Sequence, residues 1–167
     1  MNSRSFSIHT YHPDVTSVRD VVNVFYRAVH GIPDSIYSKD QKSAWAPDCM
    51  DIKGWRQRLE QAAVWVALDD KNQECLGFME LTQAGDIECL YICPRVQRQG
   101  IAKALFVTAA EFVRSQYPEK TTWSVDASDV AYEFFRKHGF MPAKRNRIER
   151  FGLVMENTTM TRSLAGA

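Results

Sequence analysis

The sequence predicts an α+β (mixed α/β) domain, in which helices flank a mostly antiparallel sheet that contains one parallel pair of strands. Apolar residues recur at helical spacing in the first third of the chain, and strand-like apolar runs follow from residue 63. A strand–helix–strand unit then spans residues 87–126. Such a unit favours a right-handed crossover, so its two strands are expected to be parallel.

The first third of the chain predicts one short strand and three helices. Apolar and polar residues alternate at the start, and three periodic segments follow, each preceded by a residue that can cap a helix. The expected elements are a strand at residues 5–10, a helix between Asp14 or Ser17 and Gly31, a helix from the capping-box-like Ser38 to about Ala46, and a helix that begins at Asp51.

The rest of the chain predicts the sheet. Residues 87–93 are apolar on both faces apart from Glu88, which indicates a central strand. The expected elements are strands at 64–68, 76–82, 87–93 and 122–126, a long helix from Gly100 to about Tyr117, a last helix from Ser128 or Asp129 to Gly139, and two closing strands up to about Thr159. Residues 1–162 are expected to form a single domain, and residues 163–167 a loose tail.

Composition and charge exclude several classes of function. The formal net charge of +1 gives no support for a nucleic-acid partner. The four cysteines form no metal-binding pattern, the histidines are scattered, and no metal is expected. We find no secretory leader and no apolar run of membrane-spanning length, so a cytoplasmic protein with reduced thiols and no membrane partner is expected.

The loop after the central strand is suited to binding an anion. Pro94 ends the strand, and a polar basic loop leads to the helix that opens at Gly100. The first N–H groups of a helix lack intrahelical partners and carry partial positive charge. Gly100 lets backbone amides approach an anion closely, and Arg95, Arg98 and Lys103 add positive charge. The alternative is an ordinary strand-to-helix turn with solvated arginines.

Two motifs resemble those of the GNAT N-acetyltransferases. Gln97-x-x-Gly100-x-Ala102 resembles the Q/R-x-x-G-x-G/A signature of that family. Ser128-x-x-Ala131-x-x-x-Phe135-x-x-x-Gly139-Phe140 resembles the family segment N-x-x-A-x-x-x-Y-x-x-x-G-F, with Ser128 in place of asparagine and Phe135 in place of the tyrosine that is the usual general acid. Residues 37–46 and the segment Trp55-x-x-Arg58-Leu59 resemble the YafP-like branch, whose acceptors are not a settled group.

The resemblance implies the GNAT acyl-CoA N-acyltransferase fold, with a splayed parallel strand pair, and acetyl-CoA (coenzyme A) as the acyl donor. In the family, loop amides hold the pyrophosphate, and strand backbone groups hold the acetyl and pantetheine arm. The cofactor-binding residues that this implies here are Leu90, Tyr91, Ile92, Gln97, Arg98, Gln99, Gly100, Ile101, Ala102, Lys103, Ser128 and Phe135.

Glu88 is the best candidate for a general base. An alkylammonium has a pKa of about 10.4, so few amines are neutral at pH 7 and a base is needed. Glu88 is the one acid within the apolar run of the central strand. With strict alternation it shares a face with Asp86, Leu90 and Ile92. The alternative is a carboxylate that is simply paired with a lysine or arginine.

The general acid and the acceptor pocket are less defined. Tyr132 lies three residues before Phe135 and could partly replace the missing tyrosine, or be only a partly exposed aromatic residue. Tyr37 and Trp45 are the leading candidates for acceptor contacts, because the family builds that pocket from this region. The expected activity is direct acetyl transfer to a primary amine of a small molecule, by a monomer or homodimer. The alternatives are a non-catalytic acyl-CoA-binding module and a protein or peptide N-acetyltransferase.

Overall fold

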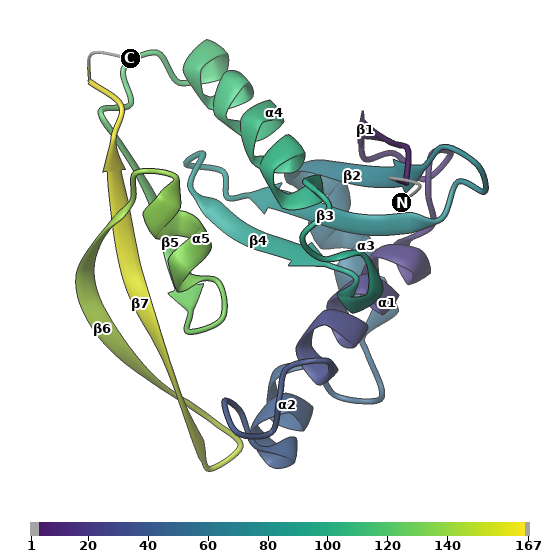
Figure 1. The fold of residues 1–167 in the computed structure, drawn as a ribbon, viewed down its shortest axis with the longest axis vertical. Coiled ribbons are helices and arrows are strands. Elements are labelled where there is room, and N and C mark those ends of the chain that lie inside the picture. Colours follow the sequence, from purple (N-terminus) through teal and green to yellow (C-terminus); the bar gives the residue numbers. More distant parts are fainter. Residues whose placement is uncertain (1–3, 166–167) are drawn as a thin grey trace.

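The computed structural model describes residues 4–165 and contains one seven-stranded sheet flanked by helices (Figure 1). The strands are β1 (Phe6–Thr10), β2 (Ala63–Asp69), β3 (Cys75–Leu81), β4 (Ile87–Ile92), β5 (Thr122–Ser128), β6 (Met141–Arg150) and β7 (Leu153–Ser163). The helices are α1 (Val18–His30), α2 (Lys39–Trp45), α3 (Ile52–Gln61), α4 (Ile101–Gln116) and α5 (Tyr132–Lys137), with a 3-10 turn, η1, at Pro94–Val96. Among the described residues, no helix is both long and apolar enough to cross a membrane.

The sheet follows the order β1-β2-β3-β4-β5-β7-β6, with a hydrophobic core on each face. On one face, the buried side of α1 and Trp55 and Leu59 of α3 pack against apolar residues of β2 and β3. On the other face, Leu105 and Phe106 of α4 pack with Trp123 of β5 and with residues around α5. The sheet is therefore the middle of three layers.

The predicted parallel pair is β4 and β5, and its strands separate along their length. In the described part of the chain they pair at one register position, Ile87 with Val125, whereas every other neighbouring pair in the sheet is antiparallel. Figure 1 shows β1 to β4 diverging from the group formed by β5, β6 and β7. The α+β fold class, with its splayed parallel pair, is confirmed.

The three helix N-termini that were predicted in the first half of the chain are confirmed. The Ser17 side chain caps α1, Ser38 and Gln41 form a reciprocal capping box at α2, and Asp51 caps α3. Each cap satisfies an N–H group that has no partner within the helix. This local chemistry explains why the boundaries could be predicted.

The last helix starts later than predicted. Ser128 is the final residue of β5, and α5 begins only at Tyr132. Pairing with β7 continues as far as Ser128 opposite Asn157, and the Ala131 N–H then bonds the Ser128 carbonyl at 3.0 Å to close a turn. Sheet pairing therefore keeps Ser128 in β5, and a turn separates it from α5, although its Oγ also accepts a hydrogen bond from the Ala131 N–H.

The closing strand also runs further than predicted. β7 continues to Ser163 instead of about Thr159, because it pairs with β5 as far as Thr122 opposite Ser163. The Leu164 N–H then bonds the Thr121 carbonyl at 2.8 Å. Residues 163–165 of the expected tail are thus part of or next to the sheet, and residues 166 and 167 lie outside the described residues.

Candidate active site

Two cavities meet where β4 and β5 separate. The loop cavity, of about 640 Å³, is lined by the loop before α4, the start of α4 and parts of α5. The aromatic cavity, of about 520 Å³, is lined by aromatic residues of α1 to α3 and by β4, β5 and β7. Both cavities are lined by Trp45, Leu90, Tyr91, Ser128 and Ala131. The two spaces are therefore neighbours across the gap in the sheet.

The loop cavity has the features of an anion site. Gly100 is the N-cap of α4 at φ +86°, with no side-chain capping hydrogen bond, so the first N–H groups of the helix stay available. A Cβ built at Gly100 would meet nothing within 4 Å, which leaves room for a ligand close to the backbone. Arg98, Lys103 and Lys137 also line this cavity. Free amides, a helix N-terminus and cations together suit a phosphate group.

Most of the predicted cofactor residues lie around this cavity. Gln99 is exposed and does not line either cavity, and Ile101 is 1% exposed, so it offers its backbone and not its side chain. Arg95 does not add charge to the loop cavity, because its guanidinium pairs with Glu74. The predicted residues that line the loop cavity are Leu90, Tyr91, Ile92, Gln97, Arg98, Gly100, Ile101, Ala102, Lys103 and Ser128.

The β4 backbone offers donors toward the gap. The Cys93 N–H bonds the Leu76 carbonyl of the β3 side at 2.8 Å. Backbone groups alternate between the two edges of a strand, so the N–H groups of Leu90 and Ile92 point toward β5. β4 pairs with β5 at Ile87, near the start of β4. The N–H groups of Leu90 and Ile92, which come later in the strand, therefore face the space between the two strands.

Glu88 lies at a β-bulge. Glu80 pairs with Cys89 and Leu81 with Ile87, so Glu88 is an extra residue with no opposite position on β3. The expectation that it shares a face with Leu90 and Ile92 is wrong. Those two pack against the core beneath α4, whereas the Glu88 carboxylate lies 3.7 Å from the Arg58 guanidinium of α3 on the opposite face. The bulge thus turns the half-exposed Glu88 side chain into the aromatic cavity.

Arg58 joins Glu88 to a buried carboxylate. Its Nε donates to Glu80 Oε1 at 2.7 Å, and its Nη2 lies 2.7 Å from Glu80 Oε2. Nη2 also donates to Cys89 Sγ at 3.0 Å. Burial lowers the pKa of Arg58, but the hydrogen bond to Glu80 and the negative charges around it raise that pKa above its ordinary value overall. The sequence alone gave no signal for the Arg58–Glu80 pair, since its members come from a helix and a strand.

The two other polar side chains on β4 do not offer a nucleophile. Burial, followed by the charge of Glu80, raises the pKa of the Cys89 thiol well above its ordinary value. Burial does the same to the Tyr91 hydroxyl. Both groups are therefore held in their neutral forms near pH 7.

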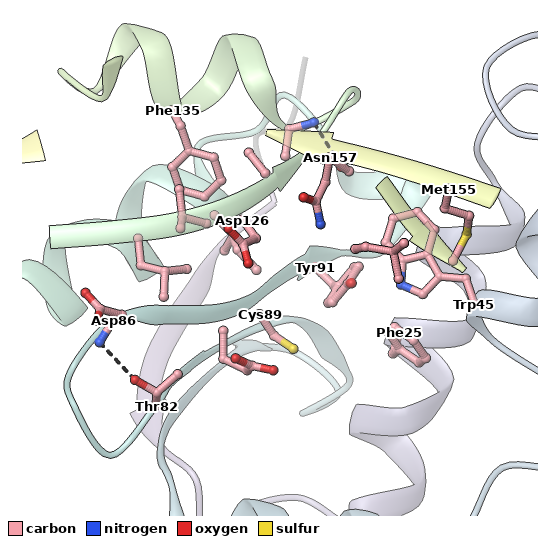
Figure 2. A pocket seen from close by; sticks show the side chains of 18 of the residues that line it. Phe25, Trp45, Thr82, Asp86, Cys89, Tyr91, Asp126, Phe135, Met155 and Asn157 are labelled. Carbon is pink, nitrogen blue, oxygen red and sulfur yellow. Dashed lines mark hydrogen bonds between the residues drawn. The ribbon is translucent and has the colours of Figure 1, made fainter. Parts of the chain in front are cut away.

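The predicted acceptor residues both line the aromatic cavity. The Tyr37 hydroxyl accepts a hydrogen bond from the Asp129 N–H at 3.1 Å and donates to the Glu156 carbonyl at 3.4 Å. It therefore ties the segment before α2 to the other half of the sheet. Trp45 lies edge-on to Tyr91, and Figure 2 shows these two residues beside Phe25 at one end of the cavity, Asp86 toward the other end and Cys89 between them.

Ser128 and Phe135 lie at the gap, but Tyr132 does not. The Ser128 Oγ accepts from the Ala131 N–H at 3.3 Å, and Ser128 lines both cavities. Phe135 is 2% exposed, extends from α5 toward β5 and lines the aromatic cavity (Figure 2). Tyr132 packs partly buried against the core and does not line either cavity.

Residues 4–165 contain no group of three or more histidine, cysteine, aspartate or glutamate side chains arranged to hold a metal ion. The cavities are instead lined by aromatic residues, backbone groups and a few charges.

Comparisons with known proteins agree with this geometry. A family model described as an acetyltransferase (GNAT) domain matches residues 33–162. The uncharacterized N-acetyltransferase YafP of Escherichia coli is 30% identical over 156 residues, which cover 93% of this chain and 95% of that protein.

Solved structures have the same fold. A GCN5-related N-acetyltransferase of Rhodopseudomonas palustris is 26% identical, with a TM-score of 0.86 over 98% of this chain and 99% of that one. An N-acetyltransferase of Thermoplasma acidophilum, solved in complex with coenzyme A, is 16% identical, with a TM-score of 0.76 over 95% of this chain and 99% of that one. The chain belongs to the GNAT family of N-acetyltransferases.

Proposed function

We propose that the protein transfers an acetyl group directly from acetyl-CoA to a primary amine of a small molecule. The observation that carries this proposal is the set of residues shared by the two cavities at the β4–β5 gap. A donor in the loop cavity and an acceptor in the aromatic cavity would meet at Leu90, Tyr91 and Ser128.

The loop cavity fits the donor. The uncapped amides at the start of α4, with Arg98 and Lys103, would hold the pyrophosphate of coenzyme A. The pantetheine arm would follow β4, whose free N–H groups at Leu90 and Ile92 point into the gap. A backbone N–H group that donates a hydrogen bond to the developing oxyanion typically lowers the activation free energy by about 3–4 kcal/mol.

Glu88 is the proposed general base. Glu88 takes a proton from the ammonium form of the acceptor, directly or through water, and the neutral amine then attacks the thioester carbon, so that the C–N bond forms as the C=O π bond opens to an oxyanion. The tetrahedral intermediate loses its second N–H proton to solvent, re-forms the carbonyl, breaks its C–S bond and releases coenzyme A as a thiolate. Since an alkyl thiol has a pKa of about 8.5, the thiolate departs near neutral pH without a dedicated acid.

The aromatic cavity supports a small acceptor. A volume of about 520 Å³, walled by Phe25, Trp45 and Trp55, suits a small molecule better than an extended macromolecule. The proposal includes a cytoplasmic location, a monomer or homodimer, and no nucleic-acid or membrane partner. A protein or peptide acceptor and a non-catalytic acyl-CoA-binding module are the outcomes that an assay has to separate.

The test is thiol release from acetyl-CoA across a panel of amines, amino acids and peptides, with the acetylated product identified. Glu88→Gln is expected to lower kcat/KM by about 10²–10⁴ near pH 7, the usual contribution of a positioned base. The deficit shrinks as pH rises, because more of the amine is already neutral. An unchanged pH–rate profile in Glu88→Gln would remove Glu88 from the mechanism.

A further inference from the structure

Four polar side chains form a hydrogen-bonded network on one face of β5, β7 and β6. The register places Asp126 opposite Thr159, and Asn146 opposite Asn157. Thr159 and Asn157 are two positions apart on β7, so their side chains share a face of the sheet. Thr159 Oγ1 lies 2.5 Å from Asp126 Oδ1, and Asn146 Nδ2 lies 2.7 Å from Thr159 Oγ1 and 2.8 Å from Asn157 Oδ1. The proposed catalysis uses none of these residues, which we call the polar network.

The chemistry of the four groups sets the direction of each hydrogen bond. An ionised carboxylate can only accept, so the one hydroxyl hydrogen of Thr159 goes to Asp126. The Thr159 oxygen then accepts from Asn146, which presents its NH₂ group to it. The same NH₂ group donates to the Asn157 carbonyl oxygen. The NH₂ group of Asn157 is therefore turned away from Asn146.

Asp126 and Asn157 are the members of the polar network that line the aromatic cavity. Figure 2 shows Asn157 between Asp126 and the end of the cavity where Phe25 and Trp45 lie. The two polar residues are diagonal neighbours on the sheet, a relation that places residues roughly 7–8 Å apart. Asn157 also pairs with Ser128, which lines both cavities. A small molecule can therefore contact both polar groups beside the place where the cavities meet.

Asp126 differs from the other carboxylates of the cavity in its partners. Each of the others lies close to a cation of the protein: Asp86 to Lys120, Glu88 to Arg58, and Glu156 to Arg145. Within residues 4–165, Asp126 forms no ion pair, and its partner is the neutral hydroxyl of Thr159. Arg150 also lines the cavity, but it lies opposite Leu153 at the other end of β7 from Thr159. The Asp126 carboxylate therefore suits a cationic group of the acceptor.

We propose that Asp126 and Asn157 select the acceptor, and that the acceptor is an aromatic primary amine with a hydrogen-bond-accepting oxygen near its nitrogen, as in an ester of an aromatic amino acid. The ammonium group binds Asp126, and the oxygen accepts from the Asn157 NH₂ group. The ring packs against the aromatic residues at the end of the cavity where Phe25 and Trp45 lie.

This arrangement presents the amine to the proposed base. Ile87 of β4 pairs with Val125 of β5, so the residues that follow, Glu88 and Asp126, come next to each other where the gap opens. Both line the aromatic cavity. An ammonium group bound by Asp126 thus lies on the side of the cavity from which Glu88 would take its proton. The proposal rests on the proposed function and names its acceptor class.

The experiment compares phenylalanine methyl ester with 2-phenylethylamine, which has the same ring and amine but lacks the ester oxygens. Binding to the complex of the protein with coenzyme A is followed by tryptophan fluorescence, since Trp45 and Trp55 line the cavity. Turnover is followed separately by thiol release from acetyl-CoA. For each variant, the ratio of the two affinities is compared with the wild-type ratio, so that differences between the free amines cancel.

Asn157→Leu is expected to lower the preference for the ester by roughly three- to tenfold, the size of one net hydrogen bond. Thr159→Val should lower it in part, because Thr159 is a positioning residue that holds the Asn157 amide in one orientation through Asn146. Asp126→Asn should weaken both amines by about tenfold, since both carry the ammonium group. Thr161→Val is the matched control: Thr161 lies two positions further along the same face of β7 and lines neither cavity, so the ratio should stay as in the wild type.

Asn157→Ala repeats the test with a smaller side chain, in case leucine disturbs this face of the sheet. If both Asn157 variants and Thr159→Val keep the wild-type ratio while thiol release continues, the assigned selection is wrong and the proposed function stands. If the ratios fall as expected but neither amine releases thiol, the acceptor site stands and acetyl transfer fails. If the wild-type protein binds neither amine, the acceptor class is wrong.

Discussion

Two residues in the loop before α4 adopt left-handed backbone conformations, Gly100 at φ +86° and Arg98 at φ +63°. An L side chain is strained there, and glycine is not. At Gly100 the strain argument joins a second one, because the space where a Cβ would lie is empty and borders the loop cavity. The glycine therefore suits the turn and also leaves open space beside the loop cavity.

We expect Gly100→Glu to weaken acetyl-CoA binding by more than about tenfold, a cost of about 1.4 kcal/mol, by placing a negative charge against the pyrophosphate. Gly152→Glu is the matched control. Gly152 also has a positive φ, +75°, and open space at its Cβ, but it lies in the turn between β6 and β7. Both variants carry similar backbone strain, so calorimetry should find a binding loss in Gly100→Glu alone. Equal affinity in the two variants would contradict the assignment of the loop.

Phe135 cannot supply a proton, and Tyr132 lies away from both cavities. We expect Tyr132→Phe to lower kcat by less than about tenfold, since departure of a thiol with a pKa of about 8.5 needs little help. Phe135→Tyr should fold and gain little or no activity. A thousandfold loss in Tyr132→Phe, with intact acetyl-CoA binding, would instead identify Tyr132 as the general acid.

The sequence predicted the chemical roles of single residues better than it predicted which residues they contact. Glu88 stood out as the one acid in an apolar strand, but the bulge that directs it depends on how β3 and β4 align. The pairing of Arg58 with Glu80 could not be predicted, because this contact joins α3 to β3. A pairing between distant segments follows from packing, which the local sequence pattern does not encode.

At the scale of elements, the loop before α4 is tethered to the sheet. Arg95 of η1 pairs with Glu74, which immediately precedes β3. The hydrogen bond from Arg95 lowers the pKa of Glu74 below its ordinary value of 4.5. A carboxylate with a lowered pKa in the folded state adds stability above the unfolded pKa, and that stability is lost as pH falls through the folded value.

We therefore expect Glu74→Gln to lower Tm at pH 7 by about 1–2 °C, the size of a partly exposed ion pair of roughly 0.5 kcal/mol. The difference from wild type should begin to shrink as pH falls below 4.5, where Glu74 of the unfolded chain binds a proton, and should be lost once pH falls through the lower pKa of the folded state. Scanning calorimetry at several pH values measures this, with Glu119→Gln as an exposed control. A Tm difference that is the same at pH 3 and pH 7 would show that the ion pair is not its cause.

Elements with strong local signals were predictable, and those set by pairing were less so. The caps at Ser17, Ser38 and Asp51 marked three helices correctly because a cap is local chemistry. Ser128 has the same chemistry but continues a strand, since β7 pairs with β5 up to that residue. The end of β7 at Ser163 was missed for the same reason.

For the whole molecule, the central feature is the gap between β4 and β5, where the two cavities meet. The sequence predicted the parallel pair through its strand–helix–strand unit. The separation of these strands was expected only through the family resemblance, because it depends on how β5 and β7 turn away from β4 (Figure 1). Under the proposed function, donor and acceptor would lie on opposite sides of this gap, so transfer would need no acyl-enzyme intermediate.

The most direct test is a single-turnover reaction of the protein–acetyl-CoA complex with an accepted amine, quenched at intervals and measured by intact-protein mass spectrometry together with product analysis. The account predicts that N-acetylated amine and free coenzyme A form in equal amounts while the protein mass stays unchanged throughout. A transient protein species heavier by one acetyl group, formed and consumed at the rate of the reaction and located on a cysteine such as Cys89, would contradict direct transfer.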